Sequence, residues 1–138
     1  MSIVKQGTVA VRDLKHRNLS DSLRVLAKNE FKASIAADIC DAIFSLEKAQ
    51  TEANDRHRII VETYAKKDSS GKLLVGPESQ AIFKDDAAES KCEAAIKALD
   101  SKKIPVQQIS KKALIKEAEN ANIKLSALLF VELRDFIK

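Results

Sequence analysis

Three kinds of residue are scarce in this 138-residue chain: glycine (3), proline (2) and aromatic side chains (4%), with no tryptophan. So few glycines exclude a glycine-rich phosphate-binding loop, which needs several of them at fixed spacing. The lack of aromatic residues leaves Leu, Ile, Val and Ala to fill the core. Such a core favours helices that pack closely through small side chains.

Long apolar runs and a basic arm are also missing. No stretch approaches the roughly 18 consecutive apolar residues that a membrane-spanning helix needs, and the first residues lack the features of an export signal. We therefore expect an intracellular protein with no membrane partner, in which Cys40 and Cys92 are buried, reduced thiols, although a disulfide between them stays geometrically open. The net charge of +4 is spread over both halves of the chain, which disfavours a dedicated polyanion-binding arm.

The strongest pattern in the sequence is that of one long helix. From Phe31 to Lys66 there is no glycine or proline, and seam positions recur at alternating spacings of four and three residues. The seam comprises Ile39, Ile43, Leu46, Gln50, Ala53, His57, Ile60 and Tyr64. We expect Gln50 and His57, its polar members, to set the register or to meet a polar partner. The helix would be about 50 Å long, which leaves part of it free for another chain.

The chain is predicted to reverse after this helix. Lys66 and Lys67 suit a helix C-terminus, where their charge complements the helix dipole, and the Asp-Ser-Ser-Gly sequence of residues 68–71 favours a turn. Residues 72–75 form a small apolar patch that predicts a β-like tip.

A second helix is predicted to begin at Gly76-Pro77-Glu78, because proline is tolerated and glutamate is favoured in a first turn, and to end near Asp100. Its inward stripe is rich in small residues: Ala81, Ala88, Cys92, Ala95 and Leu99. The two helices together predict a long antiparallel helical hairpin over residues 31–100, with a tip loop over residues 67–79.

Shorter elements flank the hairpin. The segments Ile3–Val11 and Ile104–Ile109 favour short strands that could pair, the second as an edge strand because it contains Pro105. Asn18, Ser110 and Ser126 are expected to cap short helices. The last of these helices is expected to be buried through Leu128, Leu129, Leu133, Phe136 and Ile137.

The predicted fold is mainly α with a minor β element. It consists of the long antiparallel helical hairpin, short N- and C-terminal helices and a two-stranded β pairing. We expect a single helical domain over residues 1–138, in which the terminal segments 1–29 and 101–138 pack together.

No pattern in the sequence indicates an enzyme. His16 and His57 have no second ligand at metal-binding spacing, and no serine or cysteine lies in a nucleophile motif. Asp85, Glu89 and Glu93 could in principle hold a hard cation, but a solvated acidic helix face is the better interpretation. We therefore expect no catalytic, metal-binding or cofactor-binding residue.

One local cluster of positive charge is present. Residues 101–116 contain five lysines and no acidic residue. They are Lys102, Lys103, Lys111, Lys112 and Lys116. Such a strip could contact an anion or a nucleic acid backbone, but it lacks the arginines and aromatic residues that strengthen such contacts. The favoured interpretation is that these lysines discourage unwanted sheet pairing, so a nucleic acid partner is disfavoured.

Several segments, in order and spacing, resemble a family of small bacteriophage proteins. They are the leucine-rich first helix, Lys32-Ala33-Ser34 at the start of the long helix, Tyr64-Ala65-Lys66-Lys67-Asp68 before Gly71, the acidic second helix, and the closing Leu128-Leu129 and Phe136-Ile137. The family occurs in tailed bacteriophages and is described as a long helical hairpin with a domain of unknown function. The resemblance implies a viral origin, a place in the virion or the host cytoplasm, and no catalytic residue.

Three functions are consistent with these features. The leading hypothesis is a non-enzymatic phage interaction protein, either a minor structural component of the head, neck or tail or an assembly factor, with a homo-oligomer or virion proteins as partners. The alternative is a phage-encoded regulator or inhibitor of a host protein, such as a defence protein. The third is a weak nucleic-acid binder that uses the lysine strip.

Overall fold

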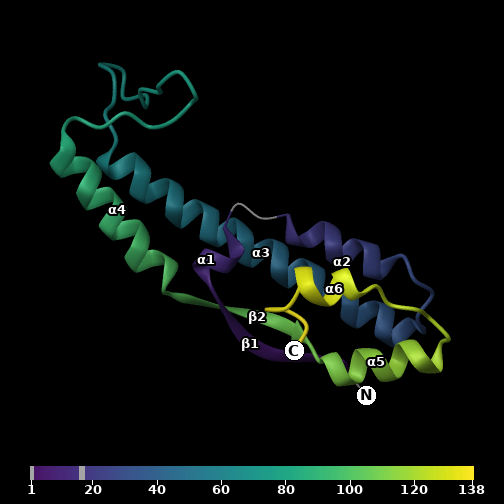
Figure 1. Ribbon diagram of the computed structural model, residues 1–138. Helices are drawn as coiled ribbons and strands as arrows, with labels where there is room; N and C mark the ends of the chain where they lie inside the picture. Colours follow the sequence, from purple (N-terminus) through teal and green to yellow (C-terminus); the bar gives the residue numbers. More distant parts are fainter. Residues whose placement is uncertain (1, 16–17) are drawn as a thin grey trace.

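The long helix α3 (Ala33–Tyr64) is the element on which the rest of the chain is built (Figure 1). The computed structural model describes residues 2–15 and 18–138. At 32 residues, α3 is about 48 Å long at 1.5 Å per residue. The absence of glycine and proline explains its continuity. The prediction of one helix over residues 31–66 is confirmed, with each end two residues further in.

The first half of α3 lies between other elements. The helix α2 (Leu19–Ala27) runs along one side of it, and the strands β1 (Val4–Ala10) and β2 (Lys103–Ile109) lie along the other (Figure 1). The strands are antiparallel, with Val4 opposite Ile109 and Ala10 opposite Lys103. The predicted β pairing is thus confirmed, and so is the mainly α fold with a minor β element.

The core lies between α3, α2 and the sheet. Leu19, Leu23 and Leu26 are spaced by four and three residues, which puts all three on the face of α2 that is buried. On β2, Ile104 and Val106 alternate with more exposed neighbours, as expected for a strand with one buried face. Burial of each such side chain stabilises the fold by about 1.5–3 kcal/mol.

A short helix that the sequence did not predict follows the first strand. The helix α1 (Val11–Leu14) begins directly after β1, and both Val11 and Leu14 are fully buried. The Val11 amide donates a hydrogen bond of 2.8 Å to the carbonyl of Lys102. Because the pairing of β1 continues up to α1, this turn fixes the strand against the end of the second hairpin helix.

Two of the three predicted caps are confirmed. The Ser110 side chain accepts from the Ala113 amide at the start of α5 (Lys111–Asn120), and the Ser126 side chain caps α6 (Ala127–Glu132). The third prediction is wrong, because the Asn18 side chain makes no capping bond and instead donates to the Asp21 carboxylate. The helix α2 nevertheless starts at the predicted residue.

The predicted final helix is too long. The helix α6 ends at Glu132, and Ile137 instead forms a parallel bridge with Ile109. The Lys138 amide donates to the Ile109 carbonyl at 3.0 Å. The second edge of β2 offers unpaired backbone groups, and these compete with the helix for the last residues of the chain. The helix is not wholly buried either, since Leu128 is 63% exposed.

The second hairpin helix starts later than predicted. The helix α4 (Asp86–Asp100) begins after Asp85, whose side chain accepts a hydrogen bond of 2.8 Å from the Ala88 amide. The predicted start at Gly76-Pro77-Glu78 is wrong because Asp85 supplies the N-cap and residues 76–80 form a turn. The connection therefore covers residues 65–85 and not 67–79, and Ala81 belongs to it.

The two cysteines have different surroundings. Cys92 is buried on the face of α4 toward α3, whereas Cys40 is exposed, and both are free. The expectation of two buried thiols is wrong for Cys40, because it is adjacent to Ile39 on α3 and points away from the core. Within residues 2–15 and 18–138, no helix is long and apolar enough to cross a membrane.

Candidate functional site: the helical arm and its tip

The distal half of α3, the helix α4 and residues 65–85 form a projection, which we call the arm (Figure 1). In Figure 1, α3 leaves the core and continues beside α4, with α1 at the base of this pair, and residues 65–85 lie at the end farthest from α5 and α6. Two helices make up most of the arm, so its described buried apolar residues are few: Ala49, Ala53, Ala65, Cys92 and Leu99. Most of the arm surface is therefore open to contact.

The predicted seam of α3 divides between these two regions. Its first five members, Ile39, Ile43, Leu46, Gln50 and Ala53, are all buried. The other three, His57, Ile60 and Tyr64, are half-buried in the arm, where α3 runs beside α4. A single stripe on one helix thus serves the core first and the hairpin afterwards.

The two polar seam residues hold the short helix α1. The Gln50 side-chain amide donates to the Leu14 carbonyl at 3.1 Å, and Lys15 Nζ lies 2.9 Å from His57 Nδ1. Lys15 Nζ also lies 2.6 Å from a carboxylate oxygen of Asp100, at the end of α4. An ammonium group can only donate, so Nδ1 of His57 is the acceptor of this bond. This buried cluster ties α1 to both hairpin helices.

The tip is built from three short segments that pair in a ring. Residues 65–67, 73–75 and 81–83 form antiparallel bridges, each with the other two. The Lys66 amide donates to the Ile82 carbonyl (2.7 Å), the Leu74 amide to the Lys66 carbonyl (2.9 Å) and the Ile82 amide to the Leu74 carbonyl (3.4 Å). The predicted β-like character of residues 72–75 is confirmed, and two further segments share it.

A hydrogen-bonded turn closes the first loop of the tip. One carboxylate oxygen of Asp68 accepts from the Ser70 hydroxyl (2.6 Å), the Ser70 amide (2.9 Å) and the Lys72 amide (3.0 Å). These bonds, the Ser70 hydroxyl first among them, lower the pKa of Asp68 below its ordinary value of 3.8. Gly71 has a φ of +86°, which favours glycine. The predicted turn at residues 68–71 is thus present, beyond the end of α3.

A groove of about 690 Å³ lies where the arm opens into its tip. We call it the fork groove, and it is lined by Thr63, Tyr64, Ala65, Lys66, Lys67, Lys84, Asp85, Ala87, Ala88 and Lys91. Its four lysines are all exposed, and in the part of the chain that the structure describes none of them forms a salt bridge. Asp85 is the single acid of the lining, and its side chain is engaged as the cap of α4. Lys66 and Lys67 lie past the end of α3 and not in its last turn, where they were predicted to complement the helix dipole.

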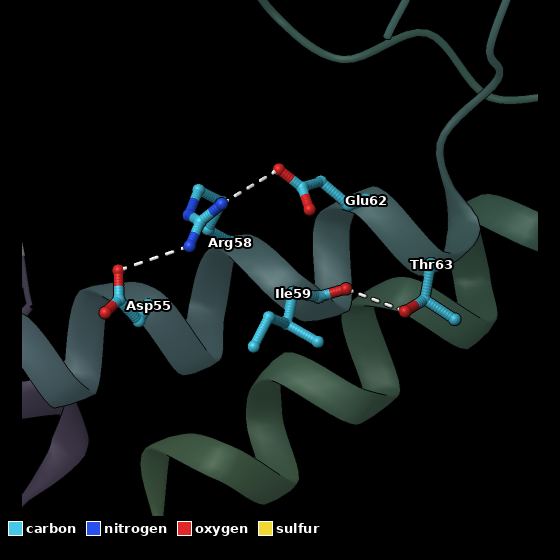
Figure 2. A network of polar contacts seen from close by, with 5 residues as sticks. All are labelled: Asp55, Arg58, Ile59, Glu62 and Thr63. Atoms are coloured by element: carbon cyan, nitrogen blue, oxygen red, sulfur yellow. Dashed lines mark hydrogen bonds and ion pairs between the residues drawn. The ribbon is translucent and has the colours of Figure 1, made fainter. Parts of the chain in front are cut away.

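The outer face of α3 in the arm has a different character (Figure 2). Arg58 lies between Asp55 and Glu62, with N–O distances of 3.4 and 3.3 Å, and the Thr63 hydroxyl donates to the Ile59 carbonyl. These charges balance one another locally, and each such exposed pair contributes less than about 1 kcal/mol. Ile59 is 55% exposed within this polar surface. The uncompensated positive charge of the arm is thus concentrated at the fork groove.

The lysine strip of residues 102–116 does not form one surface. Lys102 and Lys103 lie at the start of β2, whereas Lys111, Lys112 and Lys116 are on α5, beyond the other end of that strand. Seven strand residues span about 23 Å, so the two groups are well separated. The Lys111 ammonium lies 5.4 Å from the centre of the Phe130 ring. All five lysines are exposed to solvent, but they lie in two groups at opposite ends of β2.

The carboxylates considered for a cation remain dispersed. Asp85 caps α4, while Glu89 and Glu93 are exposed on the helix. Among the described residues, no three His, Cys, Asp or Glu side chains are grouped so that they could hold a metal ion. His16 lies outside the described residues.

Comparisons with known proteins add no relative. No protein-family model, curated protein sequence or solved structure matches this chain.

Proposed function

We propose that this protein is a non-catalytic interaction protein of a tailed bacteriophage, either a minor virion component or an assembly factor, and that the arm is its binding element. The observation that carries this proposal is the shape of the arm, which extends past the core with its surface uncovered (Figure 1). The resemblance of the sequence to small phage proteins supports the viral setting.

Exposed apolar side chains on the arm support the same proposal. Ile59 on α3 and Val75 and Ile82 in the tip are all more than a third exposed. Val75 and Ile82 lie on paired segments of the tip, and exposed apolar side chains that lie together are typical of surfaces that are covered when a partner binds. A two-helix arm also has little core of its own, so a bound partner would stabilise it further.

Mass spectrometry of purified particles and of assembly intermediates tests the proposal. The protein is expected in at least one of these fractions at a fixed ratio to a structural protein, and a variant that carries Ile59→Ser, Val75→Ser and Ile82→Ser is expected to be depleted there. The matched control is Phe44→Ser, which changes an exposed apolar residue of α3 outside the arm. Absence of the protein from both fractions, together with a monomeric state at high concentration, would contradict the proposal.

The same arm could act on a host protein, and the location of the protein separates the two functions. A phage-encoded regulator or inhibitor would be recovered from infected cells in complex with a host protein and would be missing from particles and from assembly intermediates.

A further inference from the structure

We infer that the fork groove binds an acidic, partly apolar peptide segment of a protein partner. The inference rests on the proposed interaction function and names the chemistry of the partner at one place on the arm. The groove combines three alanines in its lining with four lysines that form no salt bridge to any described residue, on a part of the molecule that projects from the core.

The charge of the groove selects an anion. Lys66 and Lys67 come from the segment just past the end of α3, Lys84 from the segment before α4, and Lys91 from α4 itself. Four ammonium groups that share one concavity repel one another, and a bound anion relieves that repulsion. Since no carboxylate of the described residues is paired with them, their charge is available to a ligand.

The size and lining of the groove suit more than a simple ion. A volume of about 690 Å³ gives this open groove room for a few residues of a peptide. Ala65, Ala87 and Ala88 contribute methyl groups to the lining, and Tyr64 contributes a half-buried ring. An apolar side chain between acidic ones would match this arrangement, with its carboxylates against the lysines.

The surroundings of the groove disfavour a long polyanion such as nucleic acid. At 100° per residue, Lys91 lies on one flank of the buried Cys92 and Leu99, whereas Glu89 and Glu93 lie on the other flank of α4. A nucleic acid backbone that left the groove across α4 would meet these acids. The groove also lacks arginine, the residue suited to bidentate phosphate contacts. A short anionic segment fits this isolated basic surface better.

Fluorescence anisotropy with defined probes tests the inference. The probes are fluorescein-labelled peptides of sequence EELEE and EESEE and a labelled single-stranded oligothymidine. The groove variant carries Lys66→Ala, Lys67→Ala and Lys84→Ala. The matched control carries Lys102→Ala, Lys103→Ala and Lys112→Ala, which removes the same charge from exposed positions outside the groove. Circular dichroism establishes that both variants are folded.

The full-length protein is expected to bind EELEE more tightly than EESEE, with an affinity that falls as salt is raised. The groove variant should bind about tenfold more weakly and the control less than twofold more weakly, because only the first loses several ion pairs with one ligand. Two outcomes would overturn the inference. One is an equal loss of peptide affinity in the groove variant and in the control. The other is that the protein binds the oligothymidine more tightly than the peptides and that only the groove variant loses this binding, which would assign the groove to nucleic acid.

The outcome is separable from that of the proposed function. If the groove variant enters particles or assembly intermediates as the unmodified protein does and binds the peptides equally well, the groove assignment fails while the interaction function stands. If the peptides bind in the groove but the protein is absent from both fractions, the phage function fails instead.

Discussion

The buried cluster around Lys15 gives the sharpest prediction of stability. Lys15 is 9% exposed and its ammonium contacts both Asp100 and His57, so the variant Lys15→Met keeps the aliphatic stem and removes both contacts. Breaking a buried ion pair from one side costs about 3–5 kcal/mol when the remaining charge stays buried. The Asp100 oxygen that contacts Lys15 is buried, but the side chain as a whole is 29% exposed, so water partly solvates the carboxylate and a loss of about 2 kcal/mol is expected.

Urea denaturation followed by circular dichroism measures this loss. A double-mutant cycle with Asp100→Asn isolates the pair, and the double variant should be less destabilised than the sum of the single variants by about 1 kcal/mol. The control is Arg24→Gln, which breaks an exposed ion pair with Glu47 and should change the free energy of unfolding by less than about 0.5 kcal/mol. A loss for Lys15→Met no larger than that of Arg24→Gln, or strict additivity in the cycle, would refute the reasoning.

Three further predictions concern individual side chains. Cys40 should react with iodoacetamide in the native protein while Cys92 stays protected, because burial shields the Cys92 thiol and raises its pKa. Mass spectrometry of the alkylated peptides measures the two reaction rates, and equal rates would contradict the prediction. The Lys72 amide resonance should titrate with a midpoint below 3.8, because the pKa of Asp68 is lowered in the folded protein. The Asp68 carboxylate therefore stabilises the turn above pH 3.8, and the turn loosens as the pH falls through the folded-state pKa. Asp68→Ala should abolish this titration, and a midpoint at or above 3.8 would count against the turn. Leu133→Ala should destabilise the fold by about 2–5 kcal/mol in chemical denaturation because the side chain is fully buried, and a loss below about 1 kcal/mol would place it outside the core.

Regular elements could be predicted from the sequence because their causes are local. The long helix follows from an uninterrupted run of helix-compatible residues, and Ser110 and Ser126 identify two helix starts through their own side chains. The pairing of the two strands was also predicted, because the sequence offers few other strand-like segments with which either of them could pair.

Features that depend on distant pairing could not be predicted in the same way. The end of α6 is decided by the free edge of β2, which only exists once β1 and β2 have paired. The tip consists of three-residue segments that are too short to show a periodicity of their own. The helix α4 begins after Asp85 and not at Gly76-Pro77-Glu78 because the chain first completes this ring.

The fork groove was missed for the same reason. Its lysines are separated by up to 25 positions in the sequence, and Lys66 and Lys67 had a sufficient local explanation as the end of a helix. The lysines that are close in sequence, from Lys102 to Lys116, drew the prediction of a strip, but β2 separates them. A signal was available in the run Tyr64 to Asp68, where two lysines directly precede a turn.

The central claim is that the arm is the part of the molecule that contacts another protein. Cross-linking mass spectrometry on particles and assembly intermediates, with an amine-reactive reagent, tests it most directly because the arm and the core both carry exposed lysines. Cross-links to one phage structural protein are expected from Lys66, Lys67, Lys84 and Lys91, and few from Lys111, Lys112 and Lys116. Cross-links to such a protein that arise from α5 and spare the arm would contradict the claim.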